Sequence, residues 1–183
     1  MKRLREQRHL SRWGLLALLG LLGPVATSVP SAVSSSLLLS PGGQVTATAG
    51  VQVNAPARWR PEAVPLVRVE IQAVPERLLP VPLMSGVSPA TAVYRIRAEP
   101  AVQTADAGRF LVRLPVKGGG TLVALRLTVP MVDLAPGVNG ASPAEAEWTS
   151  DSQATRRGNT IEFQTTSLSF GEVQYFTVVR LED

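Results

Sequence analysis

The sequence predicts an all-β protein, an antiparallel immunoglobulin-like β-sandwich of about eight or nine strands that follows an N-terminal signal helix. Short segments alternate between apolar and polar residues, which is typical of half-buried strands. Glycine and proline each occur 15 times, and proline disfavours long helices. Turn signals recur about every 8–12 residues, a spacing that favours a sandwich of short strands.

The first 28 residues have the order of a secretory signal peptide. A basic stretch at 1–12 precedes an apolar run at 13–22, and small residues follow. We expect cleavage after Ser28, because Ala26 and Ser28 are small enough for the recognition site. An uncleaved anchor is the alternative, although the apolar run is shorter than the roughly 20 residues that span a bilayer.

The remaining chain is expected to contain a tether at 29–36 and a single β-sandwich domain at 37–183. About 150 residues suffice for one domain that buries roughly two thirds of its chain surface. The candidate strands are 37–39, 44–49, 51–54, 66–74, 90–98, the two halves of 109–130, 145–150, 159–165 and 169–181.

Segment 109–130 has the clearest pattern and is expected to be a β-hairpin. Two alternating strands flank the glycines at 118–120. A period of two places one set of side chains on a buried face and the other set towards solvent. The apolar sets are Phe110, Val112 and Leu114 in the first strand and Val123, Leu125, Leu127 and Val129 in the second.

Two further strands show the same alternation. In 66–74 we expect Val67, Val69 and Ile71 to face inward and Arg68, Glu70 and Gln72 to face outward. In 159–165 we expect Ile161 and Phe163 to face inward and Glu162 and Gln164 to face outward. Between 44 and 54 the alternation continues through a bend or bulge at Gly50.

The last strand and the proline-rich segment break this simple pattern. Residues 75–89 have no clear period and predict a long loop with at most one short strand. Strand 169–181 is apolar on both faces. It is therefore expected either to be covered on both sides or to present one face to a partner.

Charge and residue usage exclude several classes of protein. The net charge of +4 arises within the first twelve residues, and from residue 13 onward 13 basic side chains balance 13 acidic ones. A neutral domain lacks the field that phosphate backbones require, so we expect no nucleic-acid partner. The chain has no cysteine, so its fold depends on an apolar core and not on disulfides.

The only histidine is His9, in the predicted leader. A processed chain would therefore have no histidine–nucleophile pair and no imidazole or thiolate metal ligand. We expect no cofactor and no metal.

The remaining candidates for chemistry are weak. Glu145 and Glu147 share a strand face, and as an acid–base pair they would need a cleft and opposed pKa shifts. A pair of solvated charges is the favoured interpretation. The candidate calcium ligands Asp106, Asp133 and Asp151 lack the dense spacing of a calcium loop. Residues 117–120 lack the spacing of a phosphate-binding loop and predict a turn.

Two regions are candidate binding surfaces. Trp59 lies between Arg58 and Arg60 in a proline-bounded loop, and tryptophan and arginine are enriched where binding energy concentrates. The favoured interpretation of Trp59 is still a core residue. Tyr175 and Phe176 represent the apolar last strand. A further candidate is a basic stripe of Arg95, Arg97 and Arg113, for which a solvated face is favoured.

Parts of the chain resemble the ZU5-type β-sandwich of bacterial surface proteins and eukaryotic adaptor proteins. The resemblance lies in Ser-Pro-Gly-Gly at 40–43 with Gly-Val-Gln-Val-Asn at 50–54, in 89–96 leading to 108–116, and in the ending 159–179. The chain departs from this pattern after Asn54, and segment 75–89 resembles an insertion. The resemblance implies an interaction sandwich without catalysis, and it assigns no binding residues.

Together these observations predict an exported, non-enzymatic module that binds an envelope or surface protein, with itself as a possible partner. The expected location is the periplasm, the cell surface or the outside of the cell, with membrane contact only through an uncleaved leader. The alternative is a structural subunit of a surface layer or appendage that self-associates through the last strand. A hydrolase that uses carboxylates alone is a remote alternative.

Overall fold

A computed structural model describes residues 34–134, 138–141 and 146–182 of the chain. The described part is all-β and its sheets are antiparallel, which confirms the predicted class. Its one helical element is a 3-10 turn, η1 (Glu76–Leu78). The predicted signal helix lies outside the described residues. Within them, no helix has the length and apolar character needed to cross a membrane.

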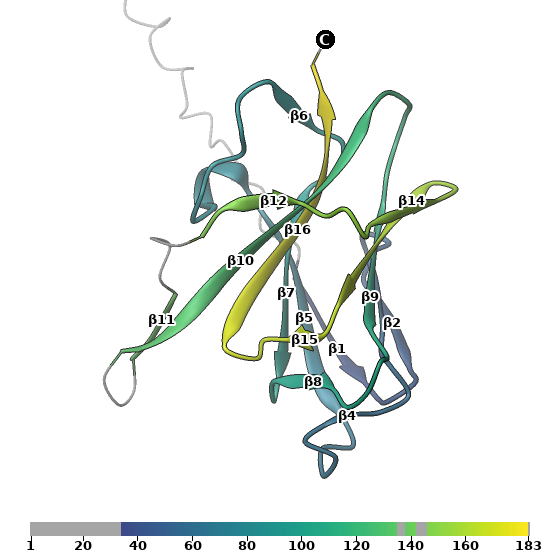
Figure 1. The fold of residues 1–183 in the computed structure, drawn as a ribbon, viewed down its shortest axis with the longest axis vertical. Coiled ribbons are helices and arrows are strands. Elements are labelled where there is room, and N and C mark those ends of the chain that lie inside the picture. The colour runs from purple at the N-terminus through teal and green to yellow at the C-terminus, as the bar shows by residue number, and fades with distance from the viewer. Residues whose placement is uncertain (1–33, 135–137, 142–145, 183) are drawn as a thin grey trace, which may run out of the picture. The chain divides into compact units, whose positions relative to one another are not determined.

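The largest described sheet has eight strands in the order β1-β5-β7-β16-β10-β11, and β12 pairs with β10 while β6 pairs with β16 (Figure 1). Its strands are β1 (Ser34–Leu39), β5 (Val67–Val74), β6 (Val87–Pro89), β7 (Val93–Glu99), β10 (Leu122–Leu134), β11 (Val138–Ala141), β12 (Trp148–Ser150) and β16 (Glu172–Leu181). β1 therefore begins inside the segment that was expected to be a tether.

Two smaller sheets complete the described part. The five-stranded sheet has the order β13-β14-β9-β3-β2, and the three-stranded sheet has the order β15-β8-β4. Their strands are β2 (Gln44–Thr46), β3 (Gln52–Asn54), β4 (Trp59–Arg60), β8 (Val102–Thr104), β9 (Phe110–Pro115), β13 (Thr155–Arg157), β14 (Thr160–Thr165) and β15 (Ser167–Leu168). Gly50, at φ 79°, lies in a tight turn between the paired strands β2 and β3, so the expected continuous bent segment is a hairpin.

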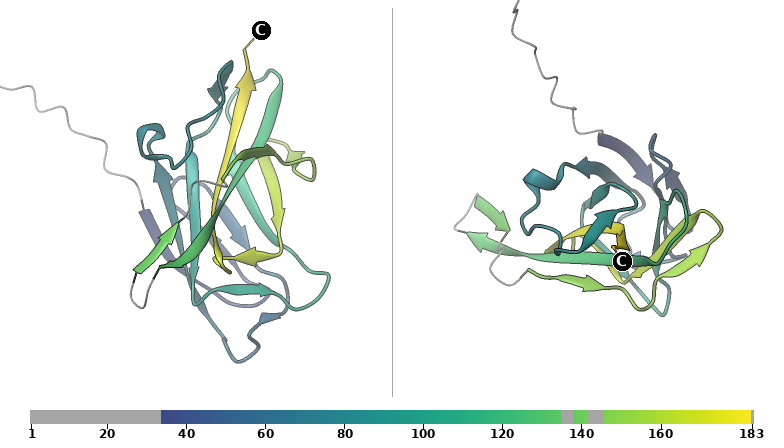
Figure 2. Two further views of the ribbon diagram at one scale, coloured as in Figure 1. Left: turned by 60° about the vertical axis from the view of Figure 1, so that its left-hand side comes forward. Right: turned by 90° about the horizontal axis from the view of Figure 1, so that it is seen from above.

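The main core lies between the eight-stranded and five-stranded sheets (Figures 1 and 2). Phe163 of β14 meets Phe176 of β16 edge to face, with 5.3 Å between the ring centroids. Both rings are fully buried, and burial of each contributes about 1.5–3 kcal/mol. The two facing sheets make the fold compatible with a β-sandwich.

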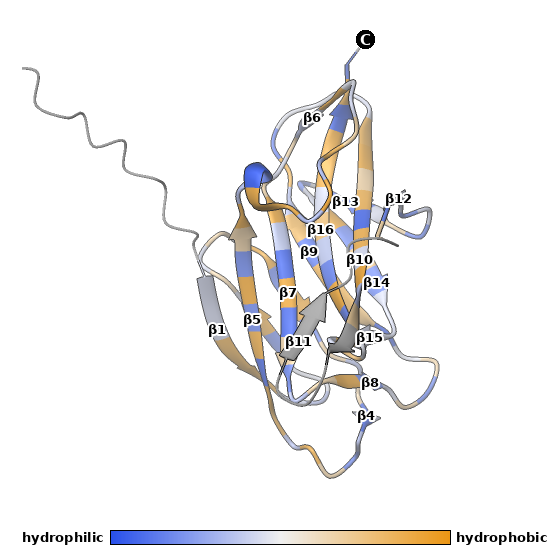
Figure 3. Cartoon of the chain, turned by 90° about the vertical axis from the view of Figure 1, so that its left-hand side faces the viewer, coloured by the Kyte–Doolittle hydropathy of each residue, from blue (hydrophilic) through white to orange (hydrophobic). Residues whose placement is uncertain are grey.

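The alternation predicted from the sequence is confirmed in several strands. Val67, Val69 and Ile71 of β5 are buried, whereas Arg68 is exposed. Phe110, Val112 and Leu114 of β9 are buried and point into the main core. Figure 3 shows the same alternation along β5 and β7 as successive hydrophilic and hydrophobic bands.

The predicted hairpin at 109–130 is wrong. β9 pairs with β3 and β14, whereas β10 pairs with β16, β11 and β12, so the two strands belong to different sheets. The glycine segment crosses between the sheets, and Arg180 of β16 donates hydrogen bonds to the carbonyl oxygens of Lys117 and Gly119. A period of two identifies the faces of a strand but not its neighbour, and for that reason the pattern suggested the wrong pairing.

The last strand, β16, is covered on both faces, which confirms the first of the two expected outcomes. Phe176 and Val178 point into the main core. Val173, Tyr175 and Val179 point to the opposite face of the sheet and join a second apolar cluster. The residues of the β10, β12 and proline-rich segments that complete this second cluster include Leu79, Val81, Leu83, Leu125, Leu127, Val129 and Trp148.

Trp148 holds the proline-rich segment against this second cluster. Its side chain is 5% exposed, and its Nε1 donates a 3.0 Å hydrogen bond to the carbonyl oxygen of Val81. The indole therefore joins β12 to the proline-rich segment 75–89. That segment has the appearance of an insertion in the sequence, and in the structure it is the lid of an apolar face.

We predict that Trp148→Ala destabilises the fold by about 3–5 kcal/mol, because a large cavity forms and the second cluster loses its cover. Urea unfolding followed by circular dichroism measures the change. Leu78→Ala in η1 is the matched control: Leu78 is 63% exposed, so its truncation should change stability by no more than about 0.5 kcal/mol. Equal effects of the two variants would contradict the role of Trp148 as a lid.

Candidate functional site

Trp59 lies in the main core and not on the surface. The indole is 2% exposed and stacks on Phe110, with 6.2 Å between ring centroids. Its Nε1 donates a 2.7 Å hydrogen bond to the carbonyl oxygen of Val64. This is the favoured sequence interpretation, and it leaves Trp59 no surface for a partner. Trp59 instead anchors the loop on which Arg58 and Arg60 are exposed.

Tyr175 and Phe176 are also inside the fold. Tyr175 is 8% exposed under the proline-rich lid, and Phe176 is fully buried, with the guanidinium of Arg126 5.5 Å from its ring centroid. The apolar faces of the last strand are therefore occupied by the chain itself. A partner cannot contact them unless the lid or the sheet opens.

The exposed arginine Arg60 lines a groove. Arg60 belongs to β4, which lies with β8 at the end of the domain away from the C-terminus (Figures 1 and 3). This loop-end groove has a volume of about 540 Å³. Its lining consists of Arg60, Pro61, Glu62, Gln103 and Phe170. Phe170 is 52% exposed, a large apolar surface for a side chain in a groove with charged neighbours.

A tight turn between β15 and β16 holds Phe170 in this position. Ser169 has φ 59° and Gly171 has φ 71°, so both flanking residues are in the left-handed region. For a serine this conformation costs on the order of 1–2 kcal/mol. The Oγ of Ser169 accepts a 2.8 Å hydrogen bond from the backbone N–H of Ala98, which fixes the turn to β7.

Phe170 is a candidate that the sequence analysis did not identify, because it lies inside the segment expected to be the last strand. The available signal was the tripeptide Ser-Phe-Gly at 169–171. A glycine just after an isolated aromatic residue favours a turn, since only glycine enters the left-handed region at little cost.

An ion pair joins the residue before β4 to the loop after β8. Arg58 lies 3.5 Å from the carboxylate of Asp106, and both side chains are exposed. The carboxylate also accepts a 2.9 Å hydrogen bond from the N–H of Gly108. This backbone hydrogen bond, with a smaller contribution from Arg58, lowers the pKa of Asp106 below its ordinary value. Asp106 therefore mainly stabilises its own loop, and the Arg58 side chain stays exposed.

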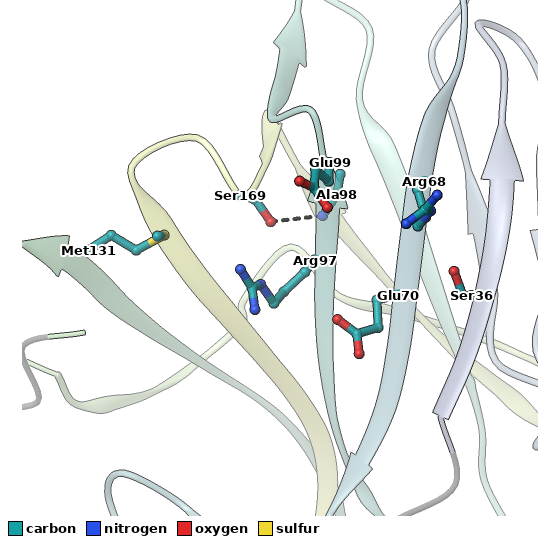
Figure 4. Close-up of a pocket in the computed structure, with 8 residues that line it drawn as sticks. All are labelled: Ser36, Arg68, Glu70, Arg97, Ala98, Glu99, Met131 and Ser169. Carbon is teal, nitrogen blue, oxygen red and sulfur yellow. Dashed lines mark hydrogen bonds between the residues drawn. The ribbon is translucent and has the colours of Figure 1, made fainter. Parts of the chain in front are cut away.

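A second concave site, the charged cleft, lies on the outer face of the eight-stranded sheet (Figure 4). Its volume is about 420 Å³, and it is lined by Ser36, Arg68, Glu70, Arg97, Ala98, Glu99, Met131 and Ser169. It opens where β7 continues past its last pair with β16, Gln174 opposite Ile96. At this position the Ser169 side chain takes the place of the missing strand partner of Ala98.

The four charges of this cleft form a checkerboard. Arg68 lies opposite Glu99 and Glu70 lies opposite Arg97 in the β5–β7 register, so the two glutamates are diagonal neighbours. Among the described residues, no ion pair within 4 Å joins these four side chains. Each carboxylate therefore has a guanidinium opposite it on the neighbouring strand. The cleft thus presents equal numbers of positive and negative charges to a ligand.

The other candidates from the sequence do not converge on a site. Arg95 and Arg97 lie on β7, whereas Arg113 lies on β9 and forms a 2.7 Å ion pair with Glu162, so the three arginines do not form one stripe. Asp151 is paired with Arg126. Glu147 is exposed, whereas Glu145 and the side chain of Asp133 lie outside the described part. The described residues contain no group of three or more histidine, cysteine or acidic side chains placed to hold a metal.

No protein-family model matches this chain, and a search of curated proteins finds no match either.

We predict that Ser169→Gly is less destabilising than Ser169→Ala. Both variants remove the acceptor for the Ala98 N–H, which costs about 1 kcal/mol, but only glycine relieves the left-handed backbone. The difference should be about 1 kcal/mol in favour of glycine by urea unfolding. If alanine proves the more stable of the two, the turn is not held against backbone strain.

Proposed function

We propose that this chain is an exported, non-enzymatic β-sandwich of immunoglobulin-like character that binds another protein of the cell envelope through the loop-end groove. The observation that carries the proposal is the exposure of Phe170 beside Arg60 in that groove. Aromatic and arginine side chains are the types in which interface binding energy concentrates. The turn maintains this exposure although the serine conformation costs free energy, which is typical of functional sites.

The build of the groove supports a protein partner. Its base is rigid, because buried Trp59 fixes the β4 loop and the Ser169 hydrogen bond fixes the β15–β16 turn. A partner would therefore bind a preformed surface and lose little conformational entropy at the groove. The resemblance to the ZU5-type sandwich implies the same kind of role. The leader-like order of 1–28 supports an envelope location.

Two alternatives have less support. The structural-subunit hypothesis relied on the apolar last strand, and this strand is covered by the chain itself. For the hydrolase hypothesis, Glu70 and Glu99 are two carboxylates of the described residues that line one cleft, but they lie opposite arginines rather than opposite each other.

The test places a photo-cross-linking amino acid at position 170 in cells that produce the full chain. The matched control places it at Met84, which is 47% exposed and lies on the proline-rich segment. The proposal expects one envelope protein to be cross-linked from position 170 and not from position 84. Identical products from the two positions, or none from either, would contradict it.

The identified partner then allows a quantitative prediction. Phe170→Ala should raise the dissociation constant of the complex on the order of tenfold or more, as expected for a central aromatic contact. Arg60→Ala should raise it by a smaller factor. Isothermal titration measures the constants. Met84→Ala should leave the constant unchanged, and all three variants should keep the melting temperature of the parent. Equal binding by Phe170→Ala and the parent would exclude the loop-end groove as the binding surface.

A further inference from the structure

Within the described part of the chain, β1 is an open sheet edge. It lies at one side of the eight-stranded sheet, paired to β5, and no other strand of the described residues pairs with it (Figure 3). Its sequence is Ser-Ser-Ser-Leu-Leu-Leu, without a charge or a proline. An open edge is a template for another strand, so proteins usually guard it with charges, prolines or short length.

The other edges of the two main sheets differ from β1. β13 has three exposed residues, of which Arg156 and Arg157 are charged. β2 has three residues, and β11, at the far edge of the large sheet, has four. β1 has six residues, so it offers the longest edge among the described strands of these sheets.

We propose that β1 pairs antiparallel with β1 of a second copy of this chain, around a two-fold axis that passes through Leu37. In this register Ser36 of each copy lies opposite Leu38 of the other. The two large sheets join into one continuous sheet, and the contact is isologous, so that it closes as a dimer.

The charges on β5 agree with this register, although they lie three strand spacings apart, about 14 Å, where their attraction is weak. Leu38 pairs with Arg68 on β5, and Ser36 pairs with Glu70. With the axis at Leu37, each row across the interface runs from Arg68 through Leu38 and the second copy's Ser36 to its Glu70. Opposite charges therefore flank the new strand pair on the outer face of the sheet.

The neighbouring registers are less favourable. A shift by one residue would place the outer face of β1 against the inner face of the second copy's β1. An axis at Ser36 would flank the interface with two Glu70 carboxylates, and an axis at Leu38 would flank it with two Arg68 guanidinium groups. Over about 14 Å this repulsion is weak, so the number of paired residues matters more: an axis at Leu38 pairs three positions of β1, whereas the axis at Leu37 pairs five.

The same register buries exposed apolar surface. Leu38 is 66% exposed, the largest exposed fraction among the large apolar side chains of the described residues. With the axis at Leu37, the two Leu38 side chains are diagonal neighbours, about 7–8 Å apart at the backbone and within reach of each other. Dimer formation therefore covers part of the most exposed large apolar side chain among the described residues.

This dimer contact does not depend on the proposed partner. β1 and the loop-end groove share no residue, so either surface can fail its test while the other passes. Cross-linking from position 170 reports on the groove, and the experiments below report on β1.

The first experiment measures the mass of the full chain by light scattering over a roughly hundredfold concentration range, in mild detergent so that the apolar N-terminal run does not cause association. We expect a concentration-dependent dimer. Leu38→Glu should abolish it, because the apolar contact of the two Leu38 side chains is replaced by two carboxylates that are diagonal neighbours across the axis. Within one copy the same substitution pairs with Arg68, so the melting temperature should not fall.

Leu78→Glu is the matched control, since Leu78 is 63% exposed and lies in η1, outside β1. It makes the same change of charge and should leave the dimer intact. A chain that stays monomeric throughout, or a dimer that is indifferent to Leu38→Glu, would overturn the proposal.

A second experiment tests the register by disulfide cross-linking. The chain has no cysteine, so Ser36→Cys and Leu38→Cys each introduce a single thiol at an exposed position. Directly opposite residues lie within disulfide range. A mixture of the two variants should give the mixed disulfide, and neither variant alone should give an efficient dimer. Efficient cross-linking of Ser36→Cys or Leu38→Cys to itself would overturn the Leu37 axis.

Discussion

The need to cover both faces of β16 explains most of this fold. Seven consecutive residues, from Val173 to Val179, are buried. A strand exposes its side chains alternately to two sides, so such a run requires an apolar layer on each side. The five-stranded sheet supplies the inner layer, and β12 with the proline-rich segment supplies the outer layer.

The same constraint explains the unusual position of β10. Its fully buried apolar residues, Leu125, Leu127 and Val129, belong to the outer cluster and not to the core between the sheets. Arg126 points to the inner side, above the ring of Phe176, and donates to the carbonyl oxygen of Gln164 on β14 and to Asp151. A charged side chain therefore ties the two sheets together, with its guanidinium held by hydrogen bonds.

The sequence was sufficient to predict the local features, because these depend on spacing along the chain. The all-β class and the inward faces of β5 and β9 follow from the period of two. The structure makes Glu162 a partial exception: its side chain is on the expected face but is only 4% exposed, because Arg113 and Arg157 lie beside it. Solvent exposure thus depended on neighbouring strands that the pattern could not identify.

The features that required the structure are the nonlocal ones. The crossing of 117–120 between sheets depends on which strands accept β9 and β10 as neighbours. The lid role of 75–89 depends on the meeting of Val81 and Trp148, which are 67 residues apart. The candidate site combines Arg60 from one loop with Phe170 from a turn far along the chain, and the sequence suggested only the first of the two.

Amide hydrogen exchange of β16, read residue by residue by mass spectrometry or NMR, tests the central claim most directly. If both layers cover this strand, its amides between Val173 and Val179 should exchange only through global unfolding, with the highest protection in the domain. Exchange of these amides well before those of β9 and β14 would show that the outer layer does not hold the strand, and would contradict the account.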